Sequence, residues 1–232
     1  MRYVRFQDLE GNVQRGKWTE DGIHGNSTIY DRDRVDLLAP VRPTKLVCAA
    51  RNYRGGVNEP PDDPDLFLKA PNAVADPRSE VSLPSHENIF FEGEIAVVVG
   101  ERCRNVPRKE AMAVVEGFTC ANDISDRSVE NTVRRKSFDG AAPLGPAVAP
   151  PDEVPTDASI EVRINGRVEQ SSDRTKLIYG VPDLMADITS RITLEPGDVL
   201  LTGSPSGMDT LDEGDVVEVE IEGVGTLCHS VR

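Results

Sequence analysis

The sequence predicts a strand-dominated α+β fold. Its apolar segments are mostly short and rich in β-branched residues, which is typical of strands. The helical segments are few and brief, so the chain lacks the regular alternation of strands and helices that builds a parallel βαβ sheet. A length of 232 residues and a hydrophobic content of 38% suffice for one substantial core.

The chain is expected to divide into a small N-terminal segment, 1–43, and a larger domain, 44–232. Glycines break the first forty residues into short polar pieces, which predicts a few short strands. At the start of the larger domain, TKLVCAA (44–50) predicts a strand. RNYRGGVNEPPDDPD (51–65) predicts a loop because it is rich in Gly, Pro and Asp, and LFLKAP (66–71) is a short apolar segment that ends at a proline.

The centre of the chain holds two predicted buried strands. FFEGEIAVVV (90–99) is the first, and FTCANDI (118–124) is the second. Between them, PRKEAMAVVEG (107–117) predicts a helix, since a proline suits its first position and a glycine its end. The polar stretch 125–136 is expected to be helical or lid-like, and SFDGAAPLGPAVAPP (137–151) is expected to be another Gly/Pro loop.

The C-terminal third combines strands with one helix. SIEVRING (159–166) ends in an Asn-Gly pair, a strong signal for a hairpin turn. Residues 181–192 have the pattern of an amphipathic helix. Strict alternation in 215–231 predicts a strand with Val217, Val219 and Ile221 on its inner face.

Composition excludes several classes of partner. A net charge of −14 makes nucleic acid a poor partner. No stretch approaches the eighteen or so apolar residues of a membrane span, and the start, MRYVRFQDLEG, lacks the apolar centre of a signal peptide. We therefore expect a cytoplasmic protein with no membrane partner. The acidic balance, with only six lysines, resembles proteins from salt-loving organisms.

Two carboxylates, Glu92 and Glu94, open the first central strand, and on a strand they share one face. Two arrangements can offset the repulsion between their charges. The pair can be structural, with one member protonated or each paired with an arginine. Alternatively, a divalent cation can bind between them, and Asp123, at the end of an apolar segment, is then the third ligand. Oxygen-only ligands indicate Mg²⁺ or Ca²⁺, or else Mn²⁺.

These features extend to longer motifs, and together they resemble the fumarylacetoacetate hydrolase superfamily. The resemblance covers residues 37 to the C-terminus. The motifs that carry it are the E-x-E at 92–94, ANDISDR (121–127), LLAPVRPTKLVCAARNY (37–53), LFLKAPNAV (66–74), KSFDGAAPLGP (136–146) and LEPGDVLLTGSPSG (194–207).

The resemblance implies a mixed β-roll catalytic domain that forms a homodimer, with Glu92, Glu94 and Asp123 as metal ligands. It also implies a small 2-oxo or dienoate carboxylate as substrate. Such a substrate chelates Mg²⁺ through its carboxylate and carbonyl oxygens, and the metal stabilises the enolate formed next. Known members hydrolyse carbon–carbon bonds, decarboxylate oxaloacetate-like acids, isomerise dienoates or dehydrate sugar acids.

The same motifs imply further site residues. Lys136 in KSFD matches a catalytic lysine; by spacing alone it would be an exposed lysine. Lys69 is a substrate-binding residue, or a charge behind the metal ligands, or part of an ion pair at the core edge. Arg127 is expected to pair with a neighbouring carboxylate. The substrate-binding residues implied by the resemblance are Arg51, Tyr53, Lys69, Thr202 and Gly203, and Arg51 also counts as catalytic.

One departure from the motifs of the family narrows the reactions that the resemblance implies. Hydrolytic and decarboxylating relatives carry a histidine three residues after the tyrosine of RNY and a glutamate three residues further on. Here Gly56 occupies the histidine position and Glu59 the glutamate position. Glu59 alone can act as a base if burial raises its pKa. His86, before the metal strand, is an alternative base or simply a surface histidine.

Without an activated water, isomerisation, tautomerisation or decarboxylation is favoured over hydrolysis, because these reactions need only metal polarisation and a proton shuttle. A carbon–carbon hydrolase of the acylpyruvate or fumarylacetoacetate type is the alternative within the family. The alternative from another class is a member that has lost catalysis and only binds metal or ligand.

Overall fold

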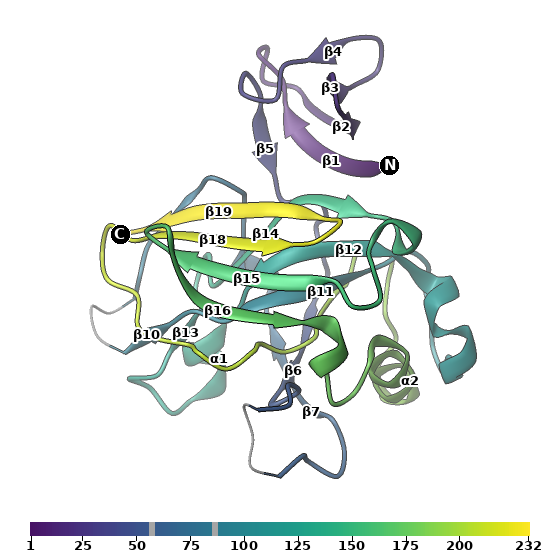
Figure 1. Cartoon of the computed structure of the whole chain (residues 1–232). Helices are drawn as coiled ribbons and strands as arrows, with labels where there is room; N and C mark the ends of the chain where they lie inside the picture. The colour runs from purple at the N-terminus through teal and green to yellow at the C-terminus, as the bar shows by residue number, and fades with distance from the viewer. Residues whose placement is uncertain (56–58, 85–87) are drawn as a thin grey trace.

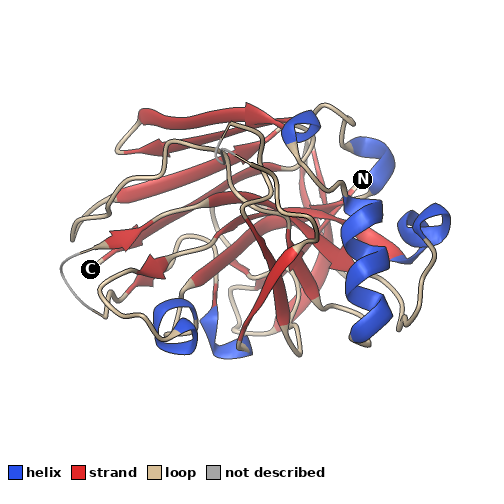
Figure 2. Cartoon of the chain, turned by 90° about the horizontal axis from the view of Figure 1, so that it is seen from below, coloured by secondary structure: helices blue, strands red, loops and turns tan. Residues whose placement is uncertain are grey.

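The computed structural model describes residues 1–55, 59–84 and 88–232. Three sheets dominate it, and the helices lie at the edges of the molecule (Figures 1 and 2). The helical elements are α1 (Thr132–Lys136), α2 (Val181–Arg191) and the 3-10 turns η1 (Pro71–Ala73), η2 (Arg108–Val114), η3 (Pro151–Glu153) and η4 (Arg174–Lys176). None of the helices described is long and apolar enough to cross a membrane.

The largest sheet has the order β4-β3-β2-β1-β14-β12-β11-β17-β6-β7, with β5 paired to β1 and β8 to β14. Its strands are β1 (Arg2–Gln7), β2 (Val13–Thr19), β3 (Gly22–His24), β4 (Ile29–Tyr30), β5 (Asp36–Leu38), β6 (Leu46–Ala50), β7 (Asp65–Lys69), β8 (Val74–Ala75), β11 (Gly93–Val99), β12 (Val115–Asn122), β14 (Ala142–Ala149) and β17 (Val199–Leu201). The N-terminal strands β1–β5 stand apart at one end of the molecule (Figure 1).

Two smaller sheets complete the fold. The five-stranded sheet has the order β16-β15-β18-β19-β9, and β10 pairs with β13 alone. Their strands are β9 (Glu80–Val81), β10 (Ile89–Phe90), β13 (Ser125–Asp126), β15 (Ser159–Ile164), β16 (Arg167–Asp173), β18 (Val216–Ile221) and β19 (Gly225–Val231).

The central strand β11 is buried on both faces, which explains its unbroken apolar run. Ile95, Val97 and Val99 pack in the main core with residues of the five-stranded sheet, including Val162 and Val219. The alternate side chains on β11 pack in a second core on the opposite face. The strand is therefore held rigidly from both sides, and the residues at its start have a fixed position.

Several predictions about elements are confirmed. The predicted strand-rich lead-in forms β1–β5, the Asn-Gly turn joins β15 to β16, and α2 spans the predicted amphipathic helix. Alternation in β18 buries Val217, Val219 and Ile221. The strand-dominated α+β class is confirmed.

Two predictions are wrong. The predicted helix at 107–117 is only the 3-10 turn η2, and its last residues already belong to β12. The predicted loop at 137–151 contains the fully buried strand β14, which pairs with β1, β12 and β8. Its prolines are tolerated because the pairing with β12 is irregular there, so ladder donors are not required at every residue.

Candidate active site

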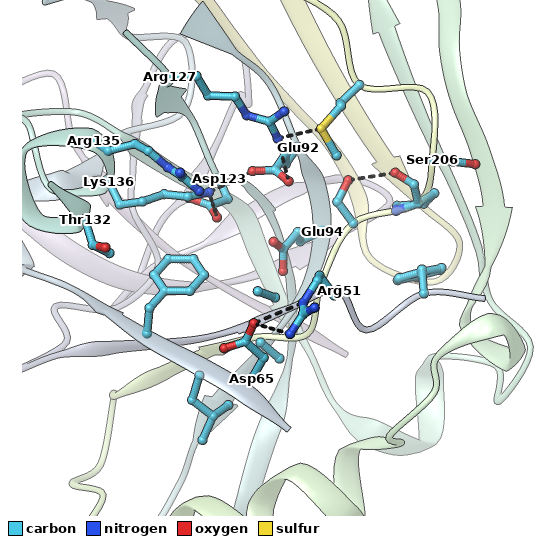
Figure 3. A pocket seen from close by; sticks show the side chains of 18 of the residues that line it. Arg51, Asp65, Glu92, Glu94, Asp123, Arg127, Thr132, Arg135, Lys136 and Ser206 are labelled. Carbon is cyan, nitrogen blue, oxygen red and sulfur yellow. Dashed lines mark hydrogen bonds and ion pairs between the residues drawn. The ribbon is translucent and has the colours of Figure 1, made fainter. Parts of the chain in front are cut away.

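A cavity of about 600 Å³ lies where the starts and ends of several strands meet. It is bordered by all three predicted metal ligands, by four cationic side chains and by the loop after β17 (Figure 3). The residues that line this cavity include Arg51, Tyr53, Asp65, Phe67, Glu92, Glu94, Asp123, Arg127, Thr132, Arg135, Lys136 and Met208.

Neighbouring strands bring the three acidic residues together. Glu92 immediately precedes β11 and Glu94 lies within it, while Asp123 immediately follows β12, the antiparallel neighbour of β11. The N–H of Asp123 donates to the carbonyl of Glu92 (2.8 Å), and the N–H of Glu92 donates to Oδ1 of Asn122 (2.9 Å). These bonds fix the backbone at the point where the carboxylates project into the cavity.

Asp123 is a buried carboxylate with two cationic partners. Lys69 and Lys136 each donate to one of its two oxygens, and the distance from Lys136 Nζ to Oδ2 is 2.5 Å. Burial alone would raise the pKa of Asp123, but the two ammonium groups lower it below its usual value. Asp123 is therefore ionised at neutral pH.

Glu94 has no such compensation. Its only hydrogen-bond donor among the described residues is the backbone N–H of Gly203, 2.5 Å from Oε2. Burial raises the pKa of Glu94 well above its usual value, and the charges of Asp123 and Glu92 raise it further. A cation placed beside Glu94 would remove this cost.

Lys136 bridges two of the acids. Its Nζ lies 2.7 Å from Oε2 of Glu92 and 2.5 Å from Oδ2 of Asp123, and it also lies over the ring of Phe67. Burial would lower the pKa of Lys136, but the charges of Asp123 and Glu92 raise it above its usual value. The side chain is buried at the end of α1, so the exposed alternative for Lys136 is wrong.

The donor set fits a hard divalent cation. Three carboxylates border one cavity, and one of them, the buried Glu94, makes no ion pair with any described residue. Within the described parts of the chain, no three acidic, histidine or cysteine side chains are arranged as a finished metal site, and Lys136 pairs with both Glu92 and Asp123. Glu92, Glu94 and Asp123 are the residues that would hold the ion, and Lys136 would then have to leave the two carboxylates that it pairs with.

Three arginines border the cavity, and they differ in their ion-pair partners. Arg51, in a left-handed backbone conformation (φ 55°), pairs with Asp65 at 3.0 Å and is largely exposed. Arg127 lies 3.8 Å from Glu92 Oε1, over the ring of Phe90, so the prediction that it pairs with a carboxylate is confirmed. Arg135 makes no ion pair with any described residue, and its Nε is buried without a hydrogen-bond partner.

Tyr53 is the most buried polar group at the cavity. Its side chain is 1% exposed, and its hydroxyl has no partner among the described residues. Burial, and then the charge of Glu94, raise the pKa of the phenol, which stays protonated as a donor. The adjacent Asn52 anchors the loop by bonding to the backbone of Tyr179 and Thr202.

Three predicted substrate-binding residues lie behind the cavity. Lys69 is fully buried and donates to Asp123 and to two carbonyl groups. The Thr202 hydroxyl donates to the carbonyl of Ile95 (2.7 Å), and Gly203 donates to Glu94. None of the three borders the cavity, because each is occupied in holding the acidic residues or the strand beneath them. For Lys69, the structure therefore favours the reading as a charge behind the metal ligands.

Glu59 is exposed and does not border the cavity, so its catalytic role stays a prediction. Gly56 and His86 lie outside the described residues. Sequence reasoning gave no role to Arg135, Thr132 or Met208. Arg135 and Thr132 are three residues apart, and this spacing on one helix face was the available signal.

A model of the family described as fumarylacetoacetate (FAA) hydrolase C-terminal matches residues 45–232. The chain belongs to the fumarylacetoacetate hydrolase family. The human mitochondrial oxaloacetate tautomerase FAHD2A is 36% identical over 226 residues, which cover 88% of this chain and 71% of that protein.

Solved structures of family members have the same fold. A 5-carboxymethyl-2-hydroxymuconate delta-isomerase from Mycobacterium smegmatis matches with a TM-score of 0.92 and 31% identity, covering 100% of this chain and 98% of that one. A maleylpyruvate hydrolase from Sphingobium sp. SYK-6, in complex with manganese(II) and pyruvate, matches with a TM-score of 0.89, 25% identity and the same coverage. The fold is therefore that of fumarylacetoacetate hydrolase enzymes.

Proposed function

We propose that the protein is a divalent-metal-dependent enzyme that tautomerises, isomerises or decarboxylates a 2-oxo acid through its enolate. The observation that carries this proposal is the buried, uncompensated Glu94 beside Glu92 and Asp123 at one cavity. Relatives support the reaction class, since they include an oxaloacetate tautomerase and a muconate isomerase. The ion is Mg²⁺, Mn²⁺ or Ca²⁺, and a family member in complex with manganese(II) and pyruvate supports a divalent cation and a small carboxylate ligand.

Bound there, the cation would act as a Lewis acid and stabilise the negative charge of the enolate. The chain's own residues position and protonate the substrate. Tyr53 has a protonated hydroxyl with no hydrogen-bond partner among the described residues, and we assign to it a hydrogen bond to a substrate oxygen. Lys136 holds its proton at Nζ, and we assign to it the proton that is added to carbon during ketonisation; the amine left behind takes up the proton released from the enol oxygen, so that the net change is a tautomerisation.

Arg51 is assigned to the rim. Arg51 pairs with Asp65, so binding a substrate carboxylate requires its guanidinium to leave Asp65. Its backbone is left-handed and its side chain is largely exposed, and the guanidinium can therefore change partner. Glu59 is exposed and lies off the cavity, which supports tautomerisation, isomerisation or decarboxylation over hydrolysis in this proposal.

The test is the ketonisation of enol-oxaloacetate by metal-stripped protein, followed by ultraviolet absorbance with and without Mn²⁺. We expect metal-dependent acceleration that chelation reverses and that Glu94→Gln lowers at least a hundredfold. Parallel assays follow decarboxylation of oxaloacetate and cleavage of an acylpyruvate. Cleavage alone would favour the hydrolase, and metal-dependent oxalate binding without turnover of any substrate would favour the non-catalytic alternative.

A further inference from the structure

Arg135 is a positive charge at the cavity that has no counter-charge among the residues the structure describes. Of the cationic side chains that border the cavity, Arg51 pairs with Asp65, and Arg127 and Lys136 lie against acidic residues. Arg135 makes no ion pair within the described part of the chain, and its Nε is buried with no acceptor. Because the side chain lines the cavity, a carboxylate of a bound ligand could supply the missing counter-charge.

The side chain is directed at the reaction site. Arg135 and Lys136 are consecutive residues of α1, and both extend toward the acidic residues in Figure 3. Lys136 reaches Glu92 and Asp123. A group bound by Arg135 would therefore belong to the same small molecule as a group bound at the carboxylates.

Thr132 adds a second polar contact. It lies three residues before Arg135 on α1 and borders the same cavity. Residues at this spacing share a helix face. A guanidinium binds a carboxylate in a bidentate manner, and a hydroxyl in the same cavity lining can donate a further hydrogen bond to that carboxylate.

We propose that Arg135, with Thr132, binds a second carboxylate of the substrate and so selects 2-oxo dicarboxylates over 2-oxo monocarboxylates. This inference rests on the proposed function. Arg135 is a specificity-determining residue in this assignment, and the rest of the site binds the 2-oxo acid end that both kinds of substrate share.

The test compares two unreactive ligands of equal chain length, 2-oxoglutarate and 2-oxopentanoate, by calorimetric titration at saturating Mn²⁺. The wild-type protein is expected to bind the dicarboxylate more tightly. Arg135→Gln should reduce that preference about ten- to a hundredfold while leaving the affinity for 2-oxopentanoate within about twofold. Thr132→Val should reduce it less.

Arg134→Gln is the matched control, because Arg134 is the exposed neighbour on α1 and does not border the cavity. It should change neither affinity. Arg135→Lys keeps the charge without the fork and should retain part of the preference, which separates recognition from loss of folding.

The outcomes are distinguishable. If wild-type protein with Mn²⁺ binds neither acid, the proposed function is overturned and the inference with it. If it binds both but Arg135→Gln leaves their ratio unchanged, or weakens both equally, only the assignment of Arg135 is overturned.

Discussion

Two carboxylates that border one cavity, Asp123 and Glu94, are in opposite electrostatic situations. Asp123 pairs with two lysines, whereas Glu94 lies near two further acids and, among the described residues, accepts a hydrogen bond only from the backbone of Gly203. Removing charge at the two positions should therefore have opposite effects on the metal-free protein.

At pH 7.5 and without metal, we expect Glu94→Gln to raise the free energy of unfolding by on the order of 1–3 kcal/mol, since the amide still accepts from Gly203 and carries no charge. Asp123→Asn should lower it by about 3–5 kcal/mol, because the buried ammonium group of Lys69 loses its ion-pair partner and Lys136 keeps only Glu92. Urea denaturation measures both. Equal losses would contradict the uncompensated state of Glu94.

His229 supports the site from behind. It is buried on β19, where its Nε2 accepts from Asn122, the residue that also binds the Glu92 backbone. Burial lowers the pKa of His229 from 6.5 to about 4. The unfolded chain therefore binds a proton that the folded chain excludes between these two values, and stability should fall as pH falls from 6.5 to 4.

We expect His229→Gln to flatten this part of the pH profile, where the histidine contributes up to ~1.4 kcal/mol per pH unit. The measurement is the urea midpoint at several pH values between 4 and 7.5. His24→Gln, at a half-exposed histidine of β3, is the control. An unchanged slope in His229→Gln would assign the acid sensitivity to the carboxylates instead.

At the scale of elements, local sequence patterns identified most strands but did not identify which strands pair with one another. The continuous apolar run of β11 and the alternation in β18 identified both strands, since burial on two faces or on one leaves a direct pattern. β14 was missed because its prolines and glycine are loop residues by local rules, and only pairing with β1 and β12 makes them a strand.

The candidate site was likewise predicted only in part from local sequence patterns. The two glutamates and the aspartate were predicted to act together, and the structure brings them to one cavity. The roles of Lys69 and Gly203 depend on which side of the carboxylates they occupy, which only the three-dimensional packing decides. Arg135 has no ion-pair partner among the described residues, and a local sequence pattern does not indicate whether a charged side chain is paired in three dimensions.

Gly93 separates the two glutamates and lies where β11 meets the five-stranded sheet. A Cβ at this position would lie 2.1 Å from Val162 Cγ2 on β15. We expect Gly93→Ala to destabilise the protein by about 1–3 kcal/mol and to weaken Mn²⁺ binding, because the start of β11 must shift. Thermal unfolding with and without Mn²⁺ measures both effects.

Gly166→Asn is the control for that change, since the hairpin glycine has open space around it and a left-handed φ that asparagine tolerates. Destabilisation without any loss of Mn²⁺-induced stabilisation in Gly93→Ala would show that the site does not depend on this contact.

At the scale of the whole molecule, the charge balance should make stability depend on salt. The net charge of −14 is carried largely by exposed acidic residues, whose repulsion salt screens within about 10 Å at 0.1 M ionic strength. We expect the melting temperature to rise as KCl increases from 0.05 to about 1 M, whether or not metal is bound. A melting temperature that is flat or falls with KCl would contradict this.

The position of Lys136 has a consequence for how the enzyme is activated. Its ammonium group pairs with two of the three acids, so a divalent ion that bound there would have to replace a cation tethered to the chain. In the proposed enzyme this exchange would release Lys136 from Glu92 and Asp123, so that one displacement would both fill the metal site and make the lysine available to the substrate.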